Sequence, residues 1–302
     1  MNKAVQCLFF SNYFVGILSI ALSLEAAVQL HLPFDSIPCY TCLFCVTVLY
    51  YTYAYIGPVS ANRSLNPRTE WYRENSTFVL NSQRILSVIC ITCCIYMVYK
   101  NYQRIIHLPA AYWLSALLAL LAGLLYYGLL PKSFLNVNLR KTGWLKAFVI
   151  GFVWACAANV LPLIAVKIEF NYVHAEPLLA VWLFIKNFMF CTVNAIMFDI
   201  KDYTDDANKD IKTFVVRFGL HKTIFFILIP LSLIGLFSFL IFVIFRSWPL
   251  VPVLFNLIPF ICLVAVVYSL QKRKKILYYL VVIDGLIFLK ALCGIAGMYF
   301  IK

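Results

Sequence analysis

The residues of this chain whose types and spacing best suit chemistry lie in an acidic stretch between Asn194 and Gly219. It holds five of the twelve acidic residues. These are Asp199, Asp202, Asp205, Asp206 and Asp210. Because the stretch directly follows an apolar run, something must offset the repulsion between its carboxylates. A bound cation would do so.

Helix geometry decides which of these carboxylates can act together. If the helix that carries Asn194 continues, a rotation of about 100° per residue places Asp199, Asp202 and Asp206 on one face, with Asp205 well off it. Three carboxylates in one stripe suit Mg²⁺, which takes oxygen ligands, keeps several waters and shares a phosphate. The alternative is a solvated acidic loop that its own lysines neutralise. Those lysines are Lys201, Lys209 and Lys212.

The composition identifies a membrane protein. Hydrophobic residues make up 64% of the chain and charged residues 12%, about half the charged fraction of soluble domains, and the mean hydropathy is +0.89. Only helices suit apolar runs of this length in lipid. We therefore predict an all-α polytopic membrane protein, a single domain over residues 1–302 with nine transmembrane helices. The spans are expected at about 11–31, 36–57, 83–100, 108–130, 143–166, 177–198, 222–245, 248–270 and 276–300, the third being the shortest.

The distribution of Lys and Arg predicts the orientation. Eighteen of them lie at the N-terminus and in the loops after spans two, four, six and eight, against five on the opposite side. The positive-inside rule then places the N-terminus and the acidic stretch in the cytoplasm, and we expect an integral protein of a bacterial inner membrane. The net charge of +13 has the same origin and indicates contact with membrane lipid rather than with nucleic acid.

Two further loops on the predicted cytoplasmic side carry cations. Arg63 and Arg68 follow the second span, and Arg140 and Lys141 precede the fifth. A diphosphate that Mg²⁺ bridges to the carboxylates would need such cations for its remaining charge. Membrane topology alone is the alternative explanation for each of them.

Four ionisable residues fall within the predicted spans and should face the bundle interior. They are Glu25, Lys186, Asp284 and Lys290. Asp284 and Lys290 are six residues apart, about 240° around a helix, so they should not pair with each other. A buried pair between Lys186 and Asp284 would satisfy both charges, as a structural pair, a substrate contact or part of an ion path.

The eleven cysteines lie almost entirely in the spans, where cysteine behaves as a small hydrophobe. Cys39-x-x-Cys42, near the external end of the second span, could form a disulfide in an oxidising space. The four histidines are scattered among the loops, which argues against a zinc site.

Residues 199–219 read DIKDYTDDANKDIKTFVVRFG, which resembles the second Asp motif of the UbiA-type intramembrane prenyltransferase family, D-x-x-D-x-x-x-D followed by G-I-x-T-x-x-V-x-x-G. The nine spans and the Arg140-Lys141 pair are also similar to that family. The resemblance implies Mg²⁺-dependent transfer of an isoprenyl group from a prenyl diphosphate to an aromatic or other lipid-soluble acceptor. It implies that Asp199, Asp202 and Asp206 are catalytic metal ligands and that Arg140 and Lys141 contact the diphosphate.

The chain departs from the family pattern in two places. Residues 53–71 contain no Asp, although the family's first motif, N-x-x-x-D-x-x-x-D, follows the second span. Asp210 replaces a Gly of the second motif. Three interpretations remain: a prenyltransferase in which Arg63 or Arg68 contacts the phosphate directly, a non-catalytic relative that binds isoprenoid lipid or scaffolds a membrane complex, and an ion-coupled transporter that uses Lys186 and Asp284.

Overall fold

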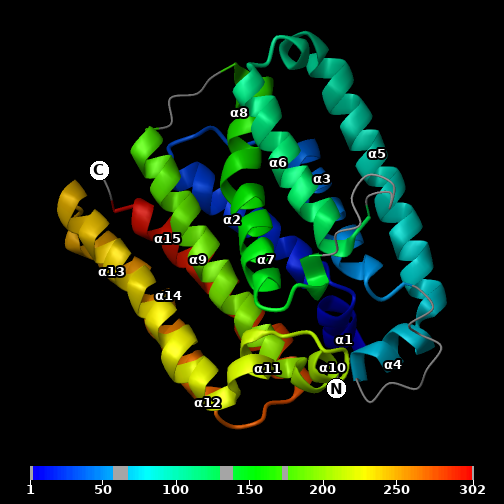
Figure 1. Ribbon diagram of the computed structural model, residues 1–302. Helices are drawn as coiled ribbons and strands as arrows, with labels where there is room; N and C mark the ends of the chain where they lie inside the picture. Colours follow the sequence, from blue (N-terminus) through cyan, green and yellow to red (C-terminus); the bar gives the residue numbers. More distant parts are fainter. Residues whose placement is uncertain (1–2, 57–66, 130–138, 172–175, 301–302) are drawn as a thin grey trace.

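The computed structural model describes residues 3–56, 67–129, 139–171 and 176–300, and every regular element within these ranges is helical. Figure 1 shows a bundle of long tilted helices, with the short helices gathered at the end where the N-terminus lies. The helices are α1 (Lys3–Phe10), α2 (Tyr13–Gln29), α3 (Ile37–Tyr53), α4 (Pro67–Glu74), α5 (Ser76–Ile106), α6 (Ala110–Tyr127), η2 (Leu139–Lys141), α7 (Leu145–Ala155), η3 (Cys156–Val160), α8 (Leu161–Phe170), α9 (Pro177–Lys201), α10 (Tyr203–Asn208), α11 (Phe214–Phe218), α12 (Leu220–Thr223), η4 (Ile224–Leu228), α13 (Ile229–Arg246), α14 (Leu250–Ser269), η5 (Tyr278–Ile283) and α15 (Asp284–Met298).

Seven helices of the described residues are long and apolar enough to cross a membrane. The pair α1 and α2, bent by 59°, forms a further candidate, and α3 is a shorter apolar helix. The fold class is therefore confirmed, while the count of nine and the side of the N-terminus stay predictions. Helix α5 covers 31 residues with a kink at Asn101, where φ is −118° and ψ is 16°, and the predicted third span, 83–100, lies within the part of α5 before this kink. The first and last turns of α5 are helical but polar, so a hydropathy pattern does not detect them.

Two of the long helices contain a π-helical turn next to a proline. Residues Cys156–Val160 precede Pro162, and residues Ile224–Leu228 precede Pro230. Proline lacks a backbone N–H and crowds the preceding turn, so the helix widens locally rather than breaking. As a result α7 and α8 form one span of 26 residues, from Leu145 to Phe170.

Helix α9 is the interior helix of the bundle. In its apolar stretch 67% of the residues are buried. The corresponding share is 6% in α6 and 11% in α5, which face outward. A glycine brings α7 close to α9: a Cβ atom on Gly151 would lie 2.1 Å from Thr192 Oγ1 and 2.8 Å from the carbonyl oxygen of Phe188. This close approach fixes the first turn of α7 beside the last turns of α9, where the acidic stretch begins.

The intramembrane charges form a cluster around Glu25 on α2. Its carboxylate lies 2.6 Å from Lys290 Nζ and 3.5 Å from Lys186 Nζ, and Lys186 also donates to Asn256 Oδ1 at 2.9 Å. All four residues are buried. The prediction of a pair between Lys186 and Asp284 is therefore wrong. The cluster joins α2, α9, α14 and α15 within the span, as buried charges require partners in lipid.

Candidate functional site

The acidic stretch is divided between two helices rather than forming one. Helix α9 ends at Lys201, Asp202 has φ −90° and ψ 8°, and α10 begins at Tyr203. The backbone N–H of Asp206 still donates to the carbonyl oxygen of Asp202 at 2.9 Å, so the chain stays compact across the break. The expectation of one uninterrupted helix is corrected, but Asp199 and Asp206 nonetheless lie on the same side.

A lysine of α7 joins these two carboxylates. Lys146 Nζ lies 2.9 Å from Asp199 Oδ1 and 2.8 Å from Asp206 Oδ2. All three residues are buried. Sequence reasoning placed Lys146 only among the basic loop residues. The sequence did contain an indication that Lys146 is buried, since it stands one turn before Ile150 on a helix face that is otherwise apolar.

The other acidic residues of the stretch are more accessible. Asp202 Oδ1 contacts Lys201 Nζ at 3.1 Å, and Asp205 is exposed. Asp210 adopts a left-handed conformation with φ 52°. Asp is among the few non-glycine residues that tolerate this conformation, so the chain keeps a turn where the family motif has Gly.

The donor set suits a magnesium ion. Asp199 Oδ2 is buried and has no hydrogen-bond partner among the described residues, although a carboxylate oxygen in that position needs one. Mg²⁺ prefers carboxylate oxygens together with water and phosphate. Asp199, Asp202 and Asp206 stay the predicted ligands of such an ion: Lys146 bridges two of them, and the three carboxylates do not form a preassembled group in the part of the chain that the structure describes.

An apolar groove of about 310 Å³ lies between α3, α6 and α7. Its wall on α7 and the following turn consists of residues spaced along one helix face below Lys146. These are Ile150, Val153, Trp154, Cys156, Ala157 and Leu161. Because side chains four, seven, eight and eleven residues apart share a helix face, Lys146 lies on the same face of α7, one turn before Ile150, the first of these wall residues.

Aromatic residues form part of the groove wall. Tyr126 and Tyr127 of α6 line the groove, and Tyr126 lies within electrostatic reach of Arg140 and of all three candidate ligand carboxylates. The Arg140 guanidinium stands 5.6 Å from the centre of the Tyr127 ring. Arg140 is thus close to a ring that lines the groove. The side chain of Lys141 and all of Arg63 lie outside the described residues.

The Arg68 side chain is buried and hydrogen-bonded to other parts of the protein. Its guanidinium donates to the carbonyl oxygen of Phe10 at 2.9 Å and to Asn12 Oδ1, and stands 4.5 Å from the Tyr55 ring centre. The residue is buried. In this arrangement Arg68 holds α4 against the bend between α1 and α2.

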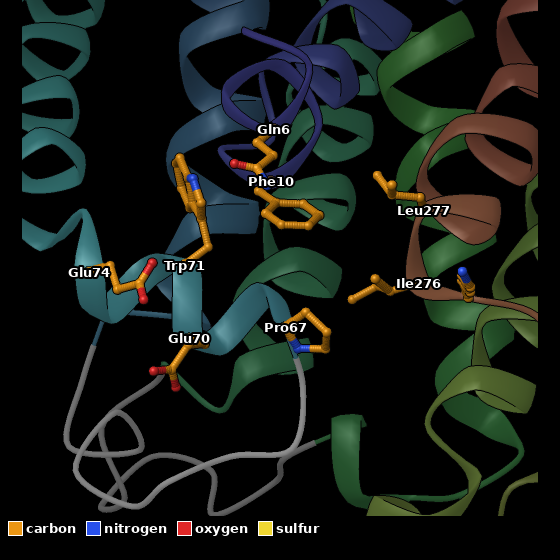
Figure 2. A pocket seen from close by; sticks show the side chains of 9 residues that line it. Gln6, Phe10, Pro67, Glu70, Trp71, Glu74, Ile276 and Leu277 are labelled. Atoms are coloured by element: carbon orange, nitrogen blue, oxygen red, sulfur yellow. The ribbon is translucent and has the colours of Figure 1, made fainter. Parts of the chain in front are cut away.

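The two glutamates of α4 border a different pocket. Figure 2 shows Glu70 and Glu74 beside Trp71 and Phe10, and this pocket of about 500 Å³ lies between α1, α4 and the segment before η5. Glu70 also pairs with Arg73 of the same helix. Both glutamates border this pocket rather than the Asp199 site. The described part of residues 53–71 therefore adds no carboxylate to the Asp199 site.

The remaining candidate residues lie inside the bundle. Asn194 is buried and donates to the carbonyl oxygen of Phe190 at 2.9 Å, while its Oδ1 atom has no partner among the described residues. Asp284 is buried on α15, and its electrostatic partners are Arg68 and Lys201. Neither contacts Lys146 or the groove.

The comparisons with known proteins agree with this geometry. The model of the family described as "UbiA prenyltransferase family" matches residues 80–283. Among solved structures, the chain is similar to the apo structure of a UbiA homolog from Aeropyrum pernix K1, with a TM-score of 0.60 and 12% identity, over 94% of this chain and 97% of that one. At this identity the likeness concerns the fold alone. A comparison with curated proteins gave no match.

Proposed function

Since the chain belongs to the UbiA prenyltransferase family, we propose that it is a membrane enzyme that transfers an isoprenyl group from a prenyl diphosphate to a lipid-soluble, aromatic or other nucleophilic acceptor. The observation that carries this proposal is the position of Lys146, which contacts Asp199 and Asp206 and stands one helical turn before Ile150, where the wall of an apolar groove begins. A charged leaving group and an apolar tail would then bind to adjacent parts of one site.

The polar part of the site suits a diphosphate. Lys146 contacts Asp199, and Arg140 stands over the Tyr127 ring that lines the groove. Both cations can donate to phosphate oxygens. A Mg²⁺ ion held by Asp199, Asp202 and Asp206 would neutralise further diphosphate charge. Fixed positive groups aimed at the departing diphosphate stabilise the charge that develops as the C–O bond breaks.

The apolar part suits an allylic cation and its tail. The rings of Tyr50, Tyr51, Tyr126, Tyr127 and Trp154 line the groove. Ring faces attract cations, and an apolar wall excludes the water that would quench a carbocation. Trp154 Nε1 donates to the Tyr51 hydroxyl at 2.6 Å, which fixes two of these rings.

The test compares neighbouring aspartates. The purified protein in nanodiscs, with Mg²⁺, geranyl and longer prenyl diphosphates and candidate acceptors, should release pyrophosphate. Asp206→Asn and Asp199→Asn should reduce release by about 100-fold or more. Asp205→Asn is the matched control, because Asp205 is exposed, and it should stay within about twofold of wild type.

Two outcomes would overturn the proposal. Binding of a prenyl diphosphate without turnover would favour a non-catalytic relative that binds isoprenoid lipid. Equal activity of the Asp205→Asn and Asp206→Asn variants would remove the buried carboxylates from the reaction.

A further inference from the structure

A cluster of three cysteines lies between α3 and α5, away from the aspartates. Cys42 of α3 faces Cys90 and Cys94 of α5, and the three Sγ atoms all lie within 4.8 Å of one another. The Cys42 and Cys94 Sγ atoms are 3.6 Å apart. Cys90 and Cys94 are one helical turn apart, so they share the face of α5 that meets α3.

The separation of the sulfur atoms suits a three-coordinate metal ion. An ion about 2.3 Å from each of three sulfurs in a plane requires sulfur–sulfur distances of roughly 4 Å. The Cys42–Cys94 separation of 3.6 Å is close to that value, and every pair of the three sulfur atoms lies within 4.8 Å. All three thiols are free, so no disulfide has to be broken before a metal binds.

The chemistry of the donors points to a soft monovalent ion. The group contains sulfur donors alone, and thiolates select Cu⁺ over the hard cations that prefer oxygen. Zn²⁺ favours four ligands in structural sites, whereas this group offers three.

From these observations we propose that Cys42, Cys90 and Cys94 bind one Cu⁺ ion, which joins α5 to α3. Binding releases protons from the thiols, because the thiolate is the ligand. The site is independent of the prenyl-transfer proposal, since it shares no residue with the Asp199 site or with the groove. It is connected to the groove only through α3, where Leu43 follows Cys42 and lines the groove wall.

The joined helix has few buried residues in its apolar stretch. Helix α5 lies at the outer edge of the bundle in Figure 1, and only 11% of its apolar stretch is buried. A ligand that binds the folded protein and not the unfolded chain raises the stability of the fold. Copper binding should therefore raise the temperature at which the protein unfolds.

The experiment is an anaerobic titration of the full chain in nanodiscs with Cu⁺, buffered by a chromophoric copper chelator. We expect one tightly bound Cu⁺ per chain, three sulfur ligands by X-ray absorption, and a higher unfolding temperature. Cys42→Ser, Cys90→Ser and Cys94→Ser should each weaken binding by about tenfold or more. Cys93→Ser is the matched control, because it alters the neighbour of Cys94 outside the cluster.

Cys94 keeps the test valid if the other variants fold poorly. Its side chain is the exposed one of the three, so Cys94→Ser should disturb the packing between α3 and α5 least. Unaltered copper affinity in Cys94→Ser, or an equal loss in Cys93→Ser, would overturn the proposal. So would binding no tighter than that of a variant in which all three cysteines are serine.

Discussion

At the scale of single residues, Lys146 determines the electrostatics of the site. Its ammonium lies between two buried carboxylates and leaves Asp199 Oδ2 without a partner among the described residues. A lysine and a divalent ion both favour the same carboxylates and repel each other. The lysine thus competes with a divalent ion for Asp199 and Asp206.

Replacing this lysine should separate metal binding from catalysis. In Lys146→Gln we expect Mn²⁺, used as a spectroscopic substitute for Mg²⁺, to bind more tightly, because the competing ammonium is gone. Pyrophosphate release should fall by about 100-fold, because the leaving group loses a cation. Electron paramagnetic resonance and the release assay measure the two effects. Lys222→Gln, an exposed lysine on α12, should change neither, and weaker Mn²⁺ binding in Lys146→Gln would contradict this account.

Asp35 gives a prediction about pH. It lies in the turn between α2 and α3, it is buried, and its Oδ1 atom has no partner among the described residues. Burial and the nearby Glu169 carboxylate raise the pKa of Asp35 to about 7. Since the unfolded value is about 3.9, its stabilising contribution is complete below about pH 4 and is lost as pH rises through 7.

The unfolding temperature should accordingly fall between about pH 4 and about pH 7. In Asp35→Asn this part of the pH dependence should disappear, because the side chain no longer titrates. Thermal unfolding in detergent at several pH values measures both. Asp205→Asn serves as the control and should keep the wild-type slope, while an unchanged slope in Asp35→Asn would show that another group is responsible.

At the scale of helices, the Glu25 cluster holds α2, α9 and α15 together. Glu25→Ala leaves the buried ammoniums of Lys186 and Lys290 without a carboxylate, which should destabilise the protein by about 3–5 kcal/mol. The double variant Glu25→Ala/Lys290→Met should recover part of this loss, since Lys186 keeps Asn256 as an acceptor. Unfolding in denaturant measures the difference. A double variant less stable than the single one would argue against charge as the cause.

The contact of α7 with α9 provides a second test at this scale. Gly151→Ala places a Cβ atom against Thr192 and the backbone of Phe188, so the helices must separate. We expect a loss of about 1–3 kcal/mol and reduced pyrophosphate release, because Lys146 moves away from Asp199. Gly285→Ala is the control, since nothing lies within 4 Å of its added Cβ. Thermal unfolding and the release assay measure both variants. Equal effects of Gly151→Ala and Gly285→Ala would show that the packing of α7 against α9 is unimportant.

At the scale of the whole molecule, the sequence predicts the helices better than their ends or their partners. The range predicted for α9, 177–198, is close to the observed Pro177–Lys201, because proline starts an apolar run and the acidic residues follow it. The range predicted for the third span covers only part of α5, because a hydropathy pattern follows lipid contact and not helix length. Lys146 was missed, because its contact with Asp199 depends on how α7 crosses α9, which periodicity within one helix does not contain.

Arg68 and the Glu25 cluster also show that spacing within one helix does not identify contacts between helices. Spacing along one helix correctly separates Asp284 from Lys290, but it cannot choose between Glu25 and Asp284 as the partner of Lys186. Arg68 was grouped with the phosphate contacts by its position in a basic loop. Its hydrogen bonds to Phe10 and Asn12 arise from residues 56 to 58 positions away.

The groove leads to a prediction about the donor that depends on the whole bundle. Ala157 lines the groove roughly 16 Å along the helix from Lys146, so Ala157→Phe should shorten the space for an isoprenoid tail while leaving Lys146 and its contacts intact. Pyrophosphate release from long-chain donors should then fall by about tenfold or more, while release from geranyl diphosphate is retained, because each apolar group excluded from the groove removes binding energy. The matched control is Ala111→Phe, which adds the same ring at an exposed position of α6. A series of donors of increasing length assayed with both variants measures the change, and an equal loss for all donors would indicate that the tail binds elsewhere in the bundle.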